Sequence, residues 1–481
     1  MNLTRQRPDG AVHPGLRWGP FTLRIPLVHV RVEMPELIQG LMVSGATGLS
    51  IVPLYTEHFG MSFETAVSMC ALMTVIVCSG PILFGDPYCG GWLTPALPLV
   101  LREALSYDTV AARTDFVNAT LLMVAVTFLV LGVSGLGSTL LRVVPRALKA
   151  GIILGAGMSA IYGEFIPRSG GRPSRIDAYT VSILLAVGIT LLLLFSLPLE
   201  RWKKRFRWLA VAASLGIAPG FFAAMVLGPW FGEVSYESFR ALFVSPVTGE
   251  WIFRLRDIFF LPDFGGLIGE YSLAARGLPD AAMMLSALPL AMAAYVIGFG
   301  DIITGTAIVN DAAPDRPDEK IPIDERRTHL AVGIRNLIQV VATGPFFPLQ
   351  GPLWTGATVV VAERYRRGRH EMDSIFGGIF SYLIFGLPIF YFVRPYLELF
   401  RPVLDVAFSL TLILTGFACA FVALSMPRNR IERGLAVLVG MLIMYFSTLV
   451  GLAVGFAGAA ALLGRQAWSR DKPILVEGKQ R

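Results

Sequence analysis

Apolar runs separated by short polar stretches make up most of this chain. In the first half they lie near residues 37–56, 63–79, 88–101, 116–137, 146–162, 178–197 and 207–232, and in the second near 281–309, 328–343, 351–363, 373–393, 401–425 and 434–463. Many of them approach or exceed the roughly 18 residues that a helix needs to cross a bilayer. The last run is longer than one span needs and is either one helix or two short ones. The pattern predicts an all-α, multi-pass membrane protein with about fourteen transmembrane segments.

The polar stretches divide the chain into five parts. These are a cytoplasmic N-terminal tail (1–33), a first repeat (34–232), an extracytoplasmic connector (233–278), a second repeat (279–464) and a cytoplasmic C-terminal tail (465–481). With both termini inside, Lys and Arg gather in the loops that face the cytoplasm of a bacterial-type inner or plasma membrane. Arg168, Arg172 and Arg175 are the exception, because they fall on the predicted outer side.

Composition supports this class and excludes several others. The chain is 54% hydrophobic and 16% charged, whereas a soluble domain has about 25% charged residues, and its mean hydropathy is +0.63. The net charge of +7 comes from short loops between apolar runs and indicates no nucleic-acid partner. The sequence holds no P-loop, no metal-ligand pattern and no acyl-transfer triad. We therefore expect neither an enzyme nor a cofactor or metal, and we assign the four cysteines to packing.

An internal repeat interrupts the third apolar segment of each half. The stretch 80–94, GPILFGDPYCGGWLT, recurs in outline as 344–355, GPFFPLQGPLWT. With an odd number of spans per half, the two copies would be inverted in the membrane, which is the signature of secondary transporters. Proline and glycine break the helix in each copy. We expect half-helices to begin near Cys89 and Pro352, with N-terminal dipoles that favour an anionic or hydrogen-bond-accepting ligand group.

Asp301 is the main candidate for function. It lies in a long apolar run between glycines, in the stretch Gly298-Phe299-Gly300-Asp301. A charge at bilayer depth costs a few kcal/mol or more, so such residues usually face a protein interior or a watery cavity. The structural alternative is a carboxylate hydrogen-bonded between packed helices. We favour the functional interpretation, in which Asp301 binds the substrate and couples its movement to protons.

The interrupted segments supply the other candidates for substrate binding, which are Gln350, Gly351, Phe299, Asp86 and Phe84. A glutamine side chain offers one acceptor and two donors, which suits a planar amide-bearing ligand. For Asp86, a local role in its turn is an equal alternative. Arg335 interrupts another apolar run; it either extends to the near interface, which we favour, or pairs with an acid such as Asp301.

The arrangement resembles the nucleobase–ascorbate transporters, which include uracil and xanthine permeases and share a fold with the sulfate-permease anion transporters. The matching stretches are 288–289 with 300–301 and 308–309, then 330–338 (LAVGIRNLI), then the Gly-Pro breaker that leads to Gln350-Gly351. The resemblance covers roughly residues 34–464. It implies a core domain of segments 1–4 and 8–11 that carries the substrate near Asp301 and Gln350. It also implies a gate domain of segments 5–7 and 12–14 that forms the scaffold and a possible homodimer contact.

The resemblance implies an elevator-like shift of core against gate, often coupled to protons. The chain departs from the nucleobase pattern, because Ile297 stands where that family has a glutamate and the tenth-segment signature is not intact. We predict a secondary active transporter in contact with membrane lipid that moves a small polar or anionic solute with a proton or another ion, and we favour a nucleobase-like substrate. The alternative is an inorganic or carboxylate anion transporter of the sulfate-permease type without a C-terminal regulatory domain. A passive channel is the second alternative.

Overall fold

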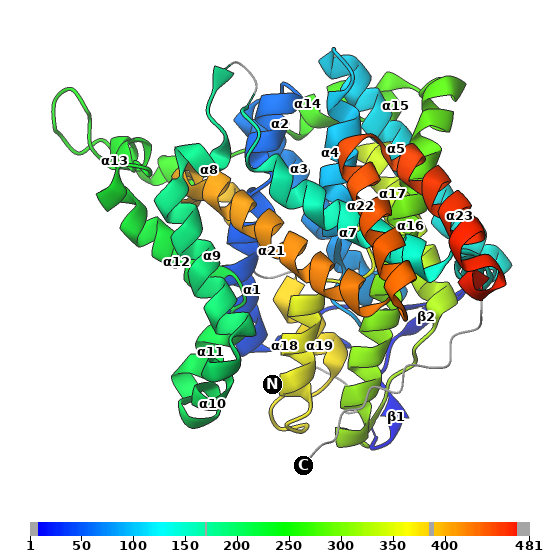
Figure 1. The fold of residues 1–481 in the computed structure, drawn as a ribbon. Coiled ribbons are helices and arrows are strands. Elements are labelled where there is room, and N and C mark those ends of the chain that lie inside the picture. Colours follow the sequence, from blue (N-terminus) through cyan, green and yellow to red (C-terminus); the bar gives the residue numbers. More distant parts are fainter. Residues whose placement is uncertain (1–7, 169–170, 384–388, 469–481) are drawn as a thin grey trace.

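The computed structural model describes residues 8–168, 171–383 and 389–468, and most of them are helical (Figure 1). We call the end of the molecule that carries α2, α8 and α14 the outer end, because the sequence predicts it to face away from the cytoplasm. The opposite end, with α10 and β1, is the inner end. Part of the predicted segment 373–393 and most of the predicted C-terminal tail lie outside the described residues.

The first half begins with three short strands, β1 (Ala11–Val12), β2 (Leu16–Trp18) and β3 (Phe21–Leu23). Its first helices are α1 (Met34–Leu49), α2 (Val52–His58), α3 (Phe63–Ser79) with the π-helical turn η1 (Gly80–Phe84), α4 (Leu97–Leu105) and α5 (Val110–Ser134). Then follow α6 (Gly137–Val143), α7 (Arg146–Gly163), α8 (Arg175–Ala178), α9 (Thr180–Phe195), α10 (Leu197–Arg205), α11 (Arg207–Ser214) and α12 (Ala218–Leu227). Between η1 and α4 lie strand β4 (Gly91–Trp92) and the 3-10 turn η2 (Thr94–Ala96).

The second half follows a connector with α13 (Glu237–Phe243), α14 (Phe264–Gly266) and α15 (Leu273–Arg276). Its helices are α16 (Ala281–Ala312), α17 (Glu325–Ala342), α18 (Thr355–Tyr365), α19 (Ile375–Leu383), α20 (Arg394–Phe400), α21 (Leu404–Ser425), α22 (Arg430–Tyr445) and α23 (Thr448–Leu463). Strand β5 (Glu319–Lys320) precedes α17, and β6 (Gln350–Gly351) precedes α18. The long run 434–463 is therefore two helices. Ser447 caps the second one by accepting a hydrogen bond from the Val450 amide at 3.3 Å.

The helices pack as two bundles. In the first bundle α5 contacts α16 and α17, α1 contacts α19, and α18 contacts α16 and α19. In the second bundle α7 contacts α21 and α22, α22 contacts α23, and α9 contacts α12 and α21. Small residues allow close approach, since a Cβ on Gly155 of α7 would lie 2.9 Å from the Gly440 carbonyl of α22. This grouping is the division into core and gate that the resemblance implies.

The expected count of fourteen membrane segments stays a prediction. In the described residues, five helices are long and apolar enough to cross a membrane, or six if the bent pair α9–α10, with its 67° bend, counts as one span. Several of the remaining segments are divided into shorter pieces by breaks, as between α1 and α2 or before α4 and α18.

The position of the Gly-Pro breakers differs from the expectation. Gly80–Phe84 continues α3 as a π-helical turn, so this breaker ends the second segment and does not lie inside the third. Gly344 likewise follows the end of α17. The predicted N-terminal tail folds onto the first bundle, because β1 pairs in parallel with β5 and the β2–β3 hairpin contacts η1.

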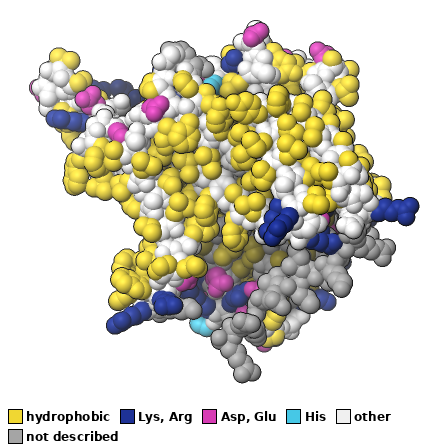
Figure 2. Space-filling model, in the orientation of Figure 1, with side chains coloured by type: hydrophobic (Ala, Val, Ile, Leu, Met, Phe, Trp, Pro, Cys, Tyr) yellow, Lys and Arg dark blue, Asp and Glu magenta, His cyan; other side chains and the backbone are white. Residues whose placement is uncertain are grey.

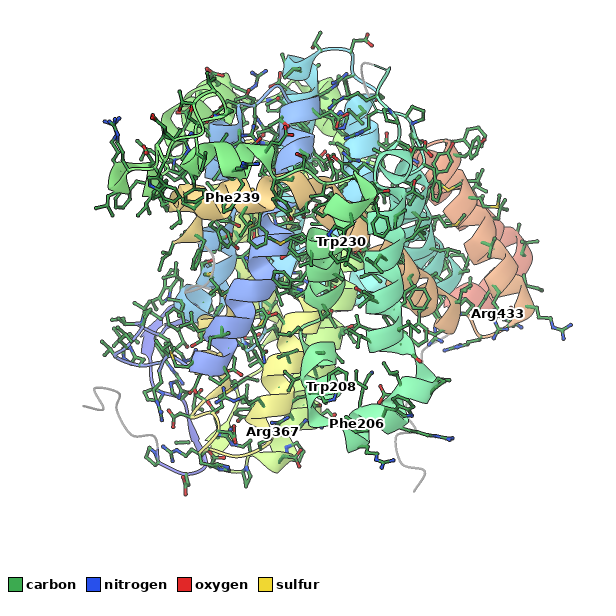
Figure 3. All side chains as sticks on the ribbon, turned by 90° about the vertical axis from the view of Figure 1, so that its left-hand side faces the viewer. Phe206, Trp208, Trp230, Phe239, Arg367 and Arg433 are labelled. Atoms are coloured by element: carbon green, nitrogen blue, oxygen red, sulfur yellow. The ribbon has the colours of Figure 1, made fainter. Side chains whose placement is uncertain are left out.

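The surface is that of an integral, multi-pass membrane protein. Hydrophobic side chains cover the middle of the face shown in Figure 2, and Lys and Arg gather toward its inner end. Trp208 and Trp230 are 69% and 79% exposed. In Figure 3 Trp208 and Phe206 lie toward the inner end, and Trp230 and Phe239 lie closer to the outer end. Exposed aromatic residues at two levels are typical of the two membrane interfaces.

Candidate functional site

Two broken segments, one from each half of the chain, cross inside the first bundle. Strands β4 and β6 pair antiparallel there, with Gly91 opposite Gly351. The Trp354 amide donates to the Cys89 carbonyl at 2.7 Å just beyond the pair. Backbone groups at membrane depth must find partners within the protein. Here each broken segment satisfies backbone groups of the other.

The close approach of the strands depends on glycine and on one strained residue. A Cβ on Gly91 would lie 2.9 Å from the Leu353 carbonyl oxygen, and a Cβ on Gly351 would lie 3.0 Å from the Leu93 nitrogen. Leu349, directly before β6, has a φ of 58°. A non-glycine residue in this region costs about 1–3 kcal/mol and persists only where its surroundings hold it. The crossing is therefore a tightly constrained piece of backbone.

The half-helices begin later than the sequence suggested. We expected them near Cys89 and Pro352, but the first turn after β4 begins at Thr94 and α18 begins at Thr355. The intervening residues are extended because they form the strand pair and its flanks. Both helix N-termini lie directly after the paired strands, so their partial positive charges are close to the crossing.

Arg335 of α17 brings a full positive charge to the same place. Its side chain is only 1% exposed, so it does not extend to the interface as we favoured. One terminal nitrogen donates to the Gly351 carbonyl of β6, and the other to the Val77 carbonyl of α3 at 3.4 Å. Nε is buried without a hydrogen-bond partner. Among the described residues no carboxylate lies within ion-pair distance of this guanidinium; Asp86, which pairs with Arg327, acts on it only from beyond that distance. The expected alternative pairing with Asp301 does not form.

Amide side chains of α17 form hydrogen bonds with strand β6. Asn336 Nδ2 donates to the Gln350 carbonyl at 2.9 Å, and Asn336 Oδ1 accepts from the Gln350 amide at 2.9 Å. The Gln350 side chain is fully buried, and its Nε2 donates to Gln339 Oε1 at 2.8 Å. Gln350 Oε1 is buried and has no partner in the described part of the chain. The side chain of Gln350 therefore bonds to α17, and substrate contact at Gln350 stays a prediction.

Asp301 lies on the side of α16 that faces the crossing. Gly298, Asp301 and Gly305 share one side of the helix by their spacing. A Cβ on Gly298 would lie 3.3 Å from Leu93, and a Cβ on Gly305 would lie 3.2 Å from Leu353. The Asp301 side chain is half-buried, and no described residue bonds to its carboxylate. The hydrogen-bonded structural alternative is therefore not what the structure shows.

The remaining predicted residues lie away from the crossing. Phe299 packs against His329 with 5.6 Å between ring centroids, on another side of α16. Asp86 Oδ1 accepts hydrogen bonds from Thr328 Oγ1 at 3.0 Å and Arg327 Nε at 3.4 Å, near the start of α17. At 1.5 Å per residue, Thr328 is about 12 Å along α17 from Asn336, which bonds to Gln350 of β6. Phe84 is covered by the N-terminal hairpin, with its ring centroid 4.9 Å from that of Phe21.

Sequence reasoning singled out Arg335 but missed the other polar residues around it in α17. Arg335, Asn336 and Gln339 of α17 and Thr343 directly after its end are all buried polar residues. Their spacing places the last three along one side of the helix, which is a signal that the sequence carries. Their partners on β6 could not be read from it.

Comparisons with known proteins agree on the fold. No protein-family model matches the chain, and no curated protein matches it in sequence. The structure of the murine Slc26a9 anion transporter in the inward-facing state has a TM-score of 0.50 and 12% identity, and the match covers 90% of this chain and 68% of that one. A second SLC26A9 structure has a TM-score of 0.48 and 12% identity, over 89% and 65%.

The transmembrane domain of a cyanobacterium bicarbonate transporter, BicA, has a TM-score of 0.48 and 13% identity, and the match covers 88% of this chain and 97% of that one. The likeness to the murine Slc26a9 structure supports the sulfate-permease type of fold, which the sequence suggested as shared with the nucleobase–ascorbate transporters. The likeness shows a membrane-transporter fold of the type seen in SLC26A9.

Proposed function

We propose that this chain is a secondary transporter of a small anion, either an inorganic ion or a carboxylate. The observation that carries the proposal is Arg335. A guanidinium that is 1% exposed and has no carboxylate at ion-pair distance among the described residues is costly at membrane depth unless another negative charge balances it. A bound anion supplies that charge, whereas a neutral nucleobase does not. The chemistry favours the anion alternative over the nucleobase-like substrate.

The anion binds beside the crossing of β4 and β6. The N-terminal ends of α4 and α18 contribute partial positive charges there, and the buried Nε of Arg335 offers a free donor. The murine neighbour is an anion transporter of the same fold, which supports this substrate class.

The site moves with the first bundle. The strands, α16 and α17 all belong to that bundle, so a shift of the first bundle against the second carries the whole site across the membrane without rebuilding it. Asp301 lies on a helix that also contacts the second bundle, because α16 packs against α7 and α23. A half-buried carboxylate at this boundary can take up a proton on one side and release it on the other. We infer that Asp301 couples anion transport to protons.

A ligand screen followed by counterflow tests the proposal. Purified full-length protein is heated with chloride, bicarbonate, sulfate, small carboxylates, uracil or xanthine, and a true ligand raises the melting temperature by binding the folded state. The stabilising anion is then used in proteoliposomes preloaded with the same anion. We expect trans-stimulated uptake of labelled anion. Stabilisation by uracil or xanthine alone would overturn the choice of anion, and uptake without trans-stimulation would indicate a channel.

A further inference from the structure

The three arginines that break the positive-inside pattern are part of a charge cluster at the outer end. Arg168, Arg172 and Arg175 meet three carboxylates, which belong to Glu57, Glu164 and Asp405. The side chains of Glu57, Glu164 and Arg175 are 4%, 1% and 7% exposed. Buried charges are tolerated when they are paired, and these are balanced three against three. Pairing within the protein explains why the loop departs from the topology rule.

Arg175 is the centre of this cluster. Its Nε donates to Asp405 Oδ1 at 3.0 Å, and its two terminal nitrogens lie 3.7 Å from Glu164 Oε1 and 3.5 Å from Glu57 Oε2. Arg172 approaches the other oxygen of Glu57 at 3.1 Å. One guanidinium therefore contacts three carboxylates, and Glu57 and Asp405 each contact two guanidiniums.

The contacts of the cluster fall into two classes. Glu164 ends α7, Asp405 begins α21, and Arg175 lies in α8, so their contacts join parts of the second bundle. Glu57 lies in α2, which follows α1 and packs against α3 of the first bundle. The contacts of Glu57 with Arg172 and Arg175 therefore connect the two bundles, at the outer end where α2 and α8 lie in Figure 1.

Further contacts join the bundles at the same end. Arg401, just before α21, places its guanidinium 4.4 Å from the centre of the Phe63 ring at the start of α3. Arg102 of α4 donates to the Met444 carbonyl of α22 at 2.7 Å. Glu103 accepts from the Thr448 amide of α23 at 3.1 Å. A shift of one bundle along the other has to break these contacts together with those of Glu57.

We propose that Glu57 forms a latch with Arg172 and Arg175 that holds the outer end closed and is released when the outer end opens. The proposal rests on the movement of the bundles that the proposed function requires. While the latch is closed, Glu57 neutralises charge in the second bundle. When the first bundle moves, it carries Glu57 away from Arg172 and Arg175. Water that enters the opening outer end then replaces Glu57 around the two guanidiniums. The strength of the latch sets how often the transporter faces outward.

Distance measurement between spin labels tests the latch without any transport assay. The four native cysteines are buried, so labels attach to cysteines introduced by Val110→Cys at the start of α5 and Trp230→Cys after α12, whose native side chains are 41% and 79% exposed. The full-length protein in lipid nanodiscs should show one dominant distance. We expect Glu57→Gln to raise the population at a second distance about fivefold or more.

Asp405→Asn is the matched control, because it also removes a carboxylate from Arg175 but acts within the second bundle. It should leave the distance distribution unchanged. An unchanged distribution in Glu57→Gln would overturn the latch, and so would an equal shift in Asp405→Asn. A shift in Glu57→Gln alone, in a protein that transports no anion, would support the latch and contradict the proposed function, so the two failures are distinguishable.

Discussion

Two buried arginines of this molecule have opposite surroundings. Arg175 at the outer end lies among three carboxylates, and Arg335 at the crossing has only backbone carbonyls as partners. A buried charge with ion-pair partners on other helices stabilises the packing of those helices. Removing one member of such a cluster leaves its partners as unpaired buried charges. A buried charge without an ion-pair partner is suited to a ligand of opposite charge. The difference separates a structural arginine from a functional one by their partners, since burial is the same for both.

The largest effect on stability should come from Arg175→Met. The substitution leaves Glu57, Glu164 and Asp405 without their central partner, and breaking a buried ion pair costs about 3–5 kcal/mol. We expect a loss of this size in the free energy of unfolding, measured by denaturant titration in a fixed detergent. Arg367→Met, at an exposed position labelled in Figure 3, removes the same charge and should change stability by less than about 0.5 kcal/mol. Equal losses in both variants would contradict the compensated cluster.

A smaller loss should follow from Gly351→Ala. The added Cβ would lie 3.0 Å from the backbone of Leu93 and Trp92, so the strands must separate. Overpacking of this kind costs about 1–3 kcal/mol. Gly188→Ala in α9 is the control, because nothing lies within 4 Å of its added Cβ and alanine favours a helix. Thermal unfolding should separate the two, and a Gly351→Ala variant as stable as wild type would show that the crossing is not tightly packed.

Arg335→Met removes a buried charge that lacks an ion-pair partner, but it also leaves the Gly351 and Val77 carbonyls without this donor. We therefore expect a loss of about 1–3 kcal/mol in the free energy of unfolding, smaller than that of Arg175→Met. The same substitution should weaken anion binding, since it removes the positive charge of the site. The melting-temperature shift caused by the anion measures this loss. A variant that unfolds as easily as Arg175→Met and still responds fully to the anion would reverse the roles of the two arginines.

Asp301→Asn should have the smallest effect on stability, because no described residue bonds to the carboxylate. We expect the variant to bind the anion and to lose the stimulation of uptake by an inward proton gradient. Uptake at equal and at unequal pH across the proteoliposome membrane measures this. Unchanged stimulation in Asp301→Asn would remove this residue from the coupling mechanism.

The sequence predicts the class of fold and the interrupted segments, because apolar run length and helix-breaking residues are local properties. It does not predict that β4 pairs with β6, since these strands are far apart along the chain and their pairing depends on the packing of the bundle. It also misplaces the first breaker, because a π-helical turn carries α3 through Gly80 and Pro81. Helix-breaking residues show that a helix is disturbed but not where the disturbance ends.

The candidate site is predicted less completely than the fold. Asp301 and Gln350 do lie beside the crossing, whereas Asp86 bonds to Arg327 and Thr328 nearer the start of α17. The sequence shows Arg335 as an oddity and Arg168, Arg172 and Arg175 as topological exceptions. Whether a buried arginine meets a carboxylate is decided by residues from other helices. The distinction between these arginines therefore requires the three-dimensional arrangement.

Counterflow of the stabilising anion in proteoliposomes tests the central claim most directly, with wild type, Arg335→Met and Arg367→Met compared side by side. Loss of one partner of a buried charge pair costs about 2 kcal/mol or more, which corresponds to about thirtyfold in affinity. We predict trans-stimulated exchange in wild type and Arg367→Met, and a half-saturating anion concentration raised about thirtyfold or more in Arg335→Met. Equal exchange at equal anion concentration in wild type and Arg335→Met would contradict the account.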